Sequence, residues 1–215
     1  MKIFVVVPAF NEKKRIAPVL SQISKMGFKA VVVDDGSSDN TGRIAKRFSP
    51  YVIRHPINLG KGAALKTGCL AAFKLGAEAV IIMDSDGQHK ASDLPKFVKA
   101  LKRCAVVLGR RNLEKIPLVR GAGNKLISFL VKFLFGIEVE DVLCGFKAFT
   151  KRAFAKIRWD SVGYSVEAEI VAMTGKHGLR YCQVPVSTVY YDRFKGLTPE
   201  SGIEILLDLF LFKLR

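Results

Sequence analysis

The apolar run at residues 80–83 stops at two carboxylates one residue apart, and this junction constrains the fold more than any other feature of the chain. A short apolar run bounded by turn residues is typical of a strand that is buried on both faces. In an open α/β sheet, ligands bind beyond the carboxyl ends of the strands. Asp84 and Asp86 are therefore expected at the mouth of a binding site. Side chains alternate along an extended chain, so both carboxylates should point the same way.

These residues form a candidate metal site. Gln88 places an amide oxygen two residues after Asp86. Carboxylate and amide oxygens are hard ligands, which Mg²⁺ and Mn²⁺ prefer. We therefore expect Asp84, Asp86 and Gln88 to hold Mg²⁺ or Mn²⁺, with open positions left for substrate phosphates. The alternative interpretation is a surface turn rich in Asp and Gly.

Two earlier apolar runs end in the same manner. Residues 3–7 lead into the polar loop 8–12, and residues 30–33 lead into Asp34 and Asp35. Helical stretches separate the runs, and this alternation predicts an α/β fold with a mostly parallel central sheet, right-handed crossovers and flanking helices. Parallel strands end at the same edge of a sheet, so the three polar loops are expected to converge there.

The length and composition of the chain predict one domain. The 215 residues suit a single core, and the 49% hydrophobic content is enough to fill it. No linker, repeat or low-complexity run interrupts the sequence. A strand is expected within two residues of the N-terminus, which argues against a secretory signal. No run of about 18 apolar residues occurs, so no transmembrane helix is predicted.

The four cysteines are scattered through the sequence without a Cys-x-x-Cys motif; they are Cys69, Cys104, Cys144 and Cys182. Their spacing indicates neither a disulfide framework nor a zinc site, although four cysteines are enough for two bridges. Reduced thiols, mostly buried, are therefore expected.

The chain is strongly basic. It carries 35 Lys and Arg residues against 19 Asp and Glu, which gives a formal net charge of +16. Such a charge favours nucleic acid, an anionic membrane or phosphorylated substrates as partners. No helix-turn-helix, RNP or zinc-finger pattern is present, so nucleic acid is not expected. The basic residues are densest between residues 102 and 132, where Glu114 is the only acid.

An apolar segment at residues 126–135 overlaps the end of this basic stretch. It is too short to span a bilayer, and two interpretations remain. One is a helix buried in the core, and the other is a helix that lies on the membrane surface with basic flanks. The C-terminal residues 202–215 are also largely apolar. The domain itself, a second copy of the chain, lipid or a separate membrane subunit could cover them.

Several sequence blocks make the chain similar to a known family. They are residues 8–12, 33–41, 58–64 and 84–89, and the later blocks 144–147 and 193–196 add to them. With these blocks in order over essentially its whole length, the chain resembles the family 2, GT-A-fold glycosyltransferases. Within that family it resembles the polyprenyl-phosphate (dolichyl-phosphate) mannose and glucose synthases. The resemblance implies one catalytic domain over residues 1–215, with a nucleotide and metal half at about 1–110 and an acceptor half with amphipathic helices at about 111–215.

The resemblance also implies a function. The expected reaction is metal-dependent transfer of a sugar from a nucleoside-diphosphate sugar, of the GDP-mannose or UDP-glucose type, to a polyprenyl or dolichyl phosphate. The enzyme is expected to be cytoplasmic and peripheral on the membrane surface, with a separate membrane subunit or a homo-oligomer as further options. Two alternatives are a family 2 transferase that acts on a sugar hydroxyl of a glycan or glycolipid, and a non-catalytic nucleotide-binding or membrane-docking module.

Individual residues receive roles from the same resemblance. Nucleotide binding is expected from Pro8, Phe10, Glu12, Asp35 and Asp84. Catalytic roles are expected from Asp86, Arg111, Arg120, Arg193, Asp141 and Glu169. Arg111 would lie by the diphosphate or the acceptor, while Arg120 and Arg193 would clamp the acceptor phosphate. Asp141 and Glu169 would each bond a sugar hydroxyl or orient an arginine. The chain departs from the family pattern at Phe10, where Tyr is usual, and at Pro199, where Lys is usual.

Overall fold

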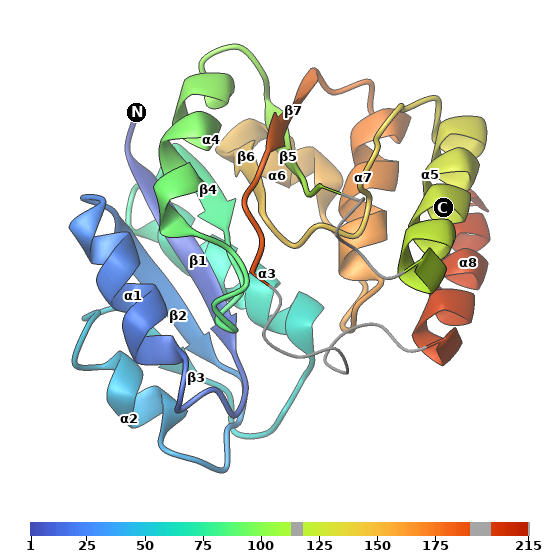
Figure 1. Ribbon diagram of the computed structural model, residues 1–215. Helices are drawn as coiled ribbons and strands as arrows, with labels where there is room; N and C mark the ends of the chain where they lie inside the picture. Colours follow the sequence, from blue (N-terminus) through green and yellow to red (C-terminus); the bar gives the residue numbers. More distant parts are fainter. Residues whose placement is uncertain (113–117, 190–198, 215) are drawn as a thin grey trace.

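The computed structural model describes residues 1–112, 118–189 and 199–214, and a seven-stranded sheet runs through this part of the chain (Figure 1). The strands lie in the order β3-β2-β1-β4-β6-β5-β7, so both halves of the sequence contribute to one sheet. Their bounds are β1 (Ile3–Ala9), β2 (Lys29–Asp34), β3 (Val52–Arg54), β4 (Ala79–Ile82), β5 (Val106–Arg110), β6 (Lys147–Thr150) and β7 (Tyr181–Pro185).

The predicted mostly parallel sheet is confirmed. β1 pairs in parallel with β2 and β4, β2 pairs in parallel with β3, and β5 pairs in parallel with β7. β6 lies antiparallel between β4 and β5 and is the one exception among the described strands. The carboxyl ends of β1, β2, β4 and β5 therefore meet at one edge of the sheet.

Helices cover both faces of the sheet, as the alternation of side chains along the strands requires. Val5 and Val7 of β1 pack in the core beneath α1 (Ile16–Lys25), α2 (Thr41–Ala45) and α4 (Leu94–Leu101), the last preceded by a short 3₁₀ turn (Ala91–Asp93). Phe4 and Val6 pack in the opposite core, beneath α3 (Lys61–Lys74), α6 (Lys151–Ile157) and α7 (Val166–Lys176). The strand residues are thus buried from both sides.

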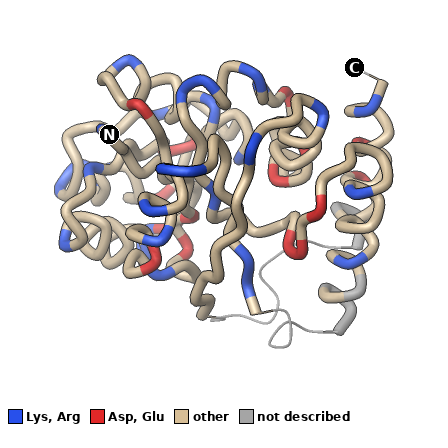
Figure 2. The backbone as a smooth tube through the Cα atoms, turned by 90° about the horizontal axis from the view of Figure 1, so that it is seen from above, with Lys and Arg blue, Asp and Glu red and all other residues tan. Residues whose placement is uncertain are grey.

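Two further helices, α5 (Leu118–Phe135) and α8 (Pro199–Leu214), pack against α7 and lie side by side at the outer edge of the fold (Figure 1). Across the described residues, no helix combines the length and the apolar character that crossing a bilayer requires. Lys and Arg recur on helices and loops over much of the molecule, so the positive charge is not gathered in one block (Figure 2).

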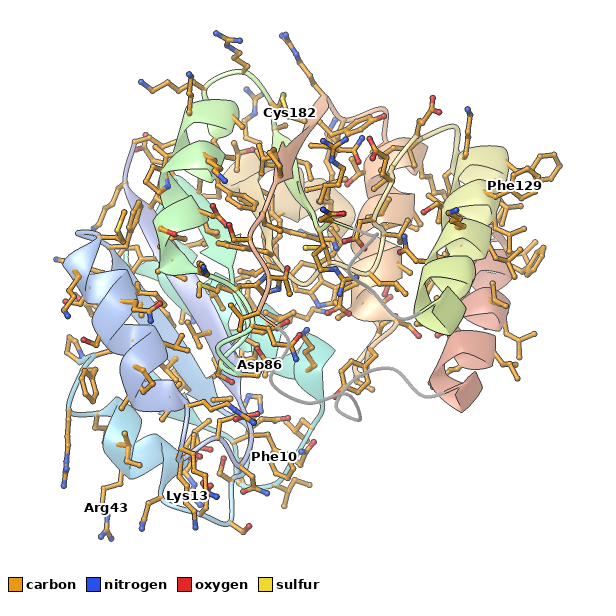
Figure 3. The ribbon with its side chains drawn as sticks, in the orientation of Figure 1. Phe10, Lys13, Arg43, Asp86, Phe129 and Cys182 are labelled. Carbon is orange, nitrogen blue, oxygen red and sulfur yellow. A yellow bond between two sulfur atoms is a disulfide. The ribbon has the colours of Figure 1, made fainter. Side chains whose placement is uncertain are left out.

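The helix α5 carries two apolar stripes. Ile127, Val131 and Phe135 are buried in the core. Phe129 and Phe133, which are 64% and 77% exposed, project from the opposite side, and Figure 3 shows Phe129 pointing away from the body of the protein. The core interpretation of this segment is therefore confirmed for the inner side of the helix, while the membrane-surface interpretation stays a prediction for its exposed side.

The helix α8 has the same two-sided character. Its inner stripe is buried and consists of Ile205, Leu209 and Phe212. The residues on its outer side are large, apolar and exposed: Ile203, Leu207, Phe210, Leu211 and Leu214. Within the described part of the chain, only one side of this helix is thus covered.

The expectation of reduced thiols is wrong for one pair of cysteines, because a disulfide joins Cys104 and Cys182. Cys182 lies on β7, and Cys104 lies two residues before β5, the parallel neighbour of β7. The two cysteines are 78 residues apart in the sequence, so local spacing carried no sign of the pairing. Cys69 and Cys144 are free and buried, as expected.

Reduction of this disulfide is expected to lower the free energy of unfolding by about 2–4 kcal/mol, because the bridge closes a long loop and restricts the unfolded chain. Urea unfolding with and without dithiothreitol measures the difference. The double variant Cys104→Ser/Cys182→Ser is the control and should unfold identically under both conditions. Equal midpoints for the oxidised and reduced wild type would contradict a stabilising bridge.

Candidate active site

The loops that follow β1 and β2 are fastened to each other by hydrogen bonds. The Asn11 backbone N–H donates to Ser37 Oγ at 3.0 Å, and the Ser38 N–H donates to Asn11 Oδ1 at 2.9 Å. The Glu12 N–H donates to Thr41 Oγ1 at 2.8 Å. Asn11 has a φ of 54°, a left-handed conformation that Asn adopts more readily than most residues. These bonds hold the two loops as one rigid edge.

Three residues expected to bind the nucleotide lie on this edge or at its base. Pro8 is buried within β1. Phe10 directly follows β1 and is 45% exposed; Figure 3 labels its position. Glu12 is buried, and its carboxylate lies 3.5 Å from the Arg15 guanidinium. Of these three residues, Phe10 is thus the one whose side chain is accessible to a ligand.

Asp35 is buried and holds the loop that precedes α3. Its Oδ1 lies 2.7 Å from His55 Nδ1 and accepts the Leu59 N–H at 3.0 Å, and its Oδ2 accepts the Gly60 N–H at 2.8 Å. A carboxylate offers about four acceptor positions, so these three contacts leave capacity for one more hydrogen bond. Asp35 therefore links the loop after β2 to the start of α3.

The predicted metal loop follows β4, but a turn shapes it rather than an extended strand. Ser85 and Asp86 lie in this turn, and Asp86 Oδ1 accepts the Gln88 N–H at 2.9 Å. Burial, together with the nearby charge of Asp84, raises the pKa of Asp86 above its ordinary value. The sequence analysis expected strand alternation to place the two carboxylates near each other. In the structure a turn does so, and each carboxylate is close enough to influence the other electrostatically.

Asp84 is bound by a lysine that sequence reasoning did not assign. Lys61 Nζ donates to Asp84 Oδ1 at 2.7 Å and to Glu167 Oε1 at 2.6 Å. Burial alone would lower the pKa of Lys61, but the two carboxylates outweigh burial and raise it, so the ammonium stays charged. Lys61 is the first residue of α3 and Glu167 lies in the first turn of α7, so this bridge ties both helices to the metal loop.

The block at residues 144–147 supports Asp84 from the other side. A Cβ at Gly145 would lie 2.4 Å from Asp84 Oδ2, so only glycine allows this approach. Lys147 is completely buried and donates through Nζ to the Val142 carbonyl at 2.9 Å and to the Cys144 carbonyl. Burial lowers the pKa of Lys147. This lysine therefore fixes the loop that contacts Asp84.

Arg111 and Asp141 form a bidentate pair at the end of β5. Arg111 Nε donates to Asp141 Oδ2 at 2.7 Å, and Nη2 donates to Oδ1 at 2.8 Å. Burial lowers the pKa of His89 to about 4, and the charges of Asp84, Arg111 and Asp141 also act on it. The arginine pair thus lies close enough to the metal loop to influence it electrostatically, and His89 is neutral at physiological pH.

Of three other expected catalytic residues, the structure describes the side chain of Glu169 but not those of Arg120 and Arg193. Glu169 is buried, and its carboxylate accepts the backbone N–H groups of Asp160 and Ser161 at 2.8–3.1 Å. Arg120 belongs to α5, but its side chain lies outside the described residues. Arg193 also lies outside them. The described part of the site therefore contains one of the three expected arginines.

The oxygen donors of the metal loop are of the chemical type that Mg²⁺ and Mn²⁺ prefer. Asp86 and Gln88 are half-buried, and Asp84 keeps one oxygen that is not held by Lys61. No group of three or more His, Cys, Asp or Glu side chains in the described residues is arranged to enclose a metal. Mg²⁺ typically binds through one or two carboxylates plus substrate phosphates and water. The two carboxylates of this loop are therefore sufficient protein ligands.

Lys61 and Glu167 are the site residues that the sequence analysis missed. Lys61 stood inside the recognised block 58–64, between two glycines, which is a signal of close backbone packing. Glu167 stands two residues before Glu169, which was chosen in its place. The structure separates the two acids, because Glu167 faces Lys61 and Glu169 binds backbone N–H groups.

Comparison with known proteins agrees with this geometry. Residues 4–158 match the family described as Glycosyl transferase family 2. An uncharacterized protein of Methanocaldococcus jannaschii is 39% identical, over 99% of this chain and 93% of its own length. The UDP-N-acetylglucosamine–dolichyl-phosphate N-acetylglucosaminyltransferase of Methanococcus voltae is 29% identical, over 99% of this chain and 96% of its own.

A solved structure shares the fold. The glucosyl-3-phosphoglycerate synthase of Mycobacterium tuberculosis, crystallised with Mn²⁺, UDP and phosphoglyceric acid, aligns with a TM-score of 0.78 at 22% identity. The alignment covers 99% of this chain and 78% of that one. The predicted GT-A fold is thereby confirmed. The family match spans most of the chain and includes β1 to β4 with their loops, so this chain belongs to glycosyl transferase family 2.

Proposed function

We propose that this chain transfers a hexose from a nucleoside-diphosphate sugar to a polyprenyl phosphate, with Mg²⁺ or Mn²⁺ bound at the metal loop. One observation carries this function: the acidic metal loop and the anchored Arg111 belong to the same fold as an exposed apolar stripe on α5. The first two suit a diphosphate donor, and the third suits a lipid acceptor. The Methanococcus voltae relative is named for a sugar nucleotide, UDP-N-acetylglucosamine, and for dolichyl phosphate, and this name supports the same type of reaction.

On the donor side, the exposed ring of Phe10 would stack on the base, and Asp35 would accept a hydrogen bond from the base or ribose. Asp84, Asp86 and Gln88 would hold the metal ion, which when bound neutralises charge on the diphosphate as it leaves. Arg111 is already oriented by Asp141, and its planar fork suits the oxygens of a phosphate. The buried residues Pro8 and Glu12 would support the nucleotide-binding loops that follow β1 and β2.

On the acceptor side, the nucleophile is a phosphate. A lipid phosphate is an anion at neutral pH, so it can attack the anomeric carbon without a general base. The reaction therefore has no need of a titrating histidine. Two anions approaching each other repel, so positive charge must screen them. Arg111, Arg120 and Arg193 are the proposed sources of that charge.

The exposed stripe of α5 would dock on the membrane that contains the acceptor. Lys125 and Lys132 flank this stripe and are themselves exposed. A helix with an apolar face and basic flanks binds at the surface of an anionic bilayer. The outer stripe of α8 lies on the neighbouring helix and would extend the same contact. This arrangement would make the enzyme peripheral on the membrane.

A transfer assay tests the proposed function directly. The protein is incubated with Mn²⁺, a polyprenyl phosphate and radiolabelled GDP-mannose, UDP-glucose or UDP-N-acetylglucosamine, and the organic phase is then counted. Label on the lipid phosphate supports the proposal, and its loss in EDTA supports the metal. Label on glycan or glycolipid hydroxyls alone would instead identify a transferase of the second class. Binding without transfer to any acceptor would identify a non-catalytic module.

Asp35→Ala is expected to weaken binding of the free nucleoside diphosphate about 10-fold. It removes one hydrogen bond to the nucleotide, worth roughly 0.5–1.5 kcal/mol, and it leaves the Leu59 and Gly60 N–H groups without their acceptor. Isothermal titration calorimetry with Mn²⁺ and the nucleotide measures the affinity. Asp39→Ala, in the same loop, is the control and should lose less affinity. An unchanged dissociation constant for Asp35→Ala would remove this residue from the site.

A further inference from the structure

Glu167 has an oxygen that nothing in the described structure satisfies. Its Oε1 accepts a hydrogen bond from Lys61 at 2.6 Å. Its Oε2 is buried and has no hydrogen-bond partner among the described residues. A buried acceptor without a partner is costly, and native proteins rarely keep one unless a ligand, water or function completes it. The free oxygen of Glu167 therefore calls for a hydrogen-bond donor that the described residues do not supply.

The position of this carboxylate is fixed from several sides. Lys61 holds Glu167 to Asp84 of the metal loop through one nitrogen. The segment before α7 is clamped to the start of α3, because the Gly62 N–H donates to the Val162 carbonyl at 2.7 Å and Trp159 Nε1 donates to the Gly62 carbonyl at 3.0 Å. Glu167 is thus a rigid acceptor held beside the metal loop.

The charge of Glu167 selects among the parts of the two substrates. The diphosphate of the donor and the phosphate of the acceptor are anions, which a neighbouring carboxylate repels. The base and ribose are proposed to meet Phe10 and Asp35, which follow β1 and β2, whereas Glu167 lies on α7. The remaining part is the sugar ring, whose hydroxyl or acetamido groups are neutral hydrogen-bond donors. Carboxylates bind such groups by charge-assisted hydrogen bonds.

From this geometry we infer that Glu167 binds a hydroxyl or amide N–H of the donor's sugar ring, and that Lys61 is the positioning residue that aims it. The inference rests on the proposed function and adds the subsite at which one sugar would be distinguished from another. A sugar that presents a donor group to Glu167 satisfies the buried oxygen. A sugar that lacks this group leaves it unsatisfied, which is an effective way to reject a ligand.

The test compares two ligands that differ only in the sugar. Dissociation constants are measured by calorimetry with Mn²⁺. The ligands are whichever of GDP-mannose, UDP-glucose and UDP-N-acetylglucosamine the wild type binds most tightly, and the same nucleoside diphosphate without its sugar. Glu167→Ala should weaken binding of the sugar nucleotide about 10-fold or more and change that of the free nucleotide by less than about twofold, because one charge-assisted hydrogen bond is lost. Lys61→Met should weaken sugar-nucleotide binding in the same direction.

Controls separate this subsite from damage to the fold. Glu167→Gln keeps the side-chain volume, and circular dichroism shows whether each variant is folded. Asp160→Asn before α7 removes the charge of an exposed carboxylate and should leave both dissociation constants unchanged. Weakening of neither ligand by folded Glu167→Ala, or equal weakening of both by folded Glu167→Ala or Glu167→Gln, would overturn the sugar subsite. Failure of the wild type to bind any sugar nucleotide would instead overturn the proposed function.

Discussion

Asp86→Ala is expected to abolish sugar transfer, with a loss of at least about 1,000-fold, while the protein stays folded. Among the described residues no lysine forms an ion pair with this carboxylate, so its removal would take away the proposed principal metal ligand. Loss of a bound metal removes several kcal/mol of charge stabilisation from the departing diphosphate, which corresponds to a rate loss of this size. Transfer to lipid phosphate, measured at saturating Mn²⁺, gives the result.

The stability of this variant is expected to change by less than about 1 kcal/mol. Burial and the charge of Asp84 already disfavour the ionised form of Asp86, as its raised pKa indicates, so removing that charge relieves a repulsion. Urea unfolding checks this point, and Asp160→Ala, which removes an exposed carboxylate, is the control for activity. Wild-type rates for Asp86→Ala, unchanged by EDTA, would show that the loop holds no catalytic metal.

The double variant Phe129→Ser/Phe133→Ser is expected to bind anionic liposomes at least about 100-fold more weakly than the wild type. Both rings are exposed and four residues apart on one side of α5, so they would enter the bilayer together. Two aromatic side chains supply roughly 3–5 kcal/mol of transfer free energy between water and an apolar medium. Cosedimentation at low and high salt separates this part from the attraction of the basic residues, which salt screens.

The exposure of these two side chains also predicts that the variant folds normally. Substitutions at exposed positions usually change the free energy of unfolding by less than about 0.5 kcal/mol each. Phe48→Ser is the matched control, because it removes an exposed aromatic side chain in the loop after α2, away from α5. Its liposome binding should equal that of the wild type. Full liposome binding by the folded double variant would defeat membrane insertion through α5.

Much of the fold follows from short-range patterns. The apolar runs at residues 3–7, 30–33 and 80–83 gave three neighbouring strands, because buried parallel strands are continuous in hydrophobicity. The direction of β6 did not follow from such a pattern, since a strand reads alike in both directions. The turn at Ser85 and Asp86 was also missed, because the extended alternation was carried two residues beyond β4.

The candidate site was accessible to sequence reasoning where its residues stand at strand ends. Asp84 and Asp86 could be recognised because the sequence changes abruptly from apolar to acidic residues at the end of β4. Lys61 and Glu167 do not, because each comes from a separate helix and their meeting depends on tertiary packing. The same holds for the disulfide between Cys104 and Cys182, whose partners become neighbours only when β5 and β7 pair. Long-range partners of this kind leave no periodic trace in one sequence.

The two apolar stripes of α5 place two separate demands on one stretch of sequence. A polar change at Val131, in the inner stripe, acts on folding, and in a cell it would reduce the amount of protein through degradation. A polar change at Phe133, in the outer stripe, would leave that amount intact and, under the proposed docking, weaken the attachment of the enzyme to the membrane. Neighbouring codons of a single helix would therefore govern two different traits, how much enzyme there is and where it works.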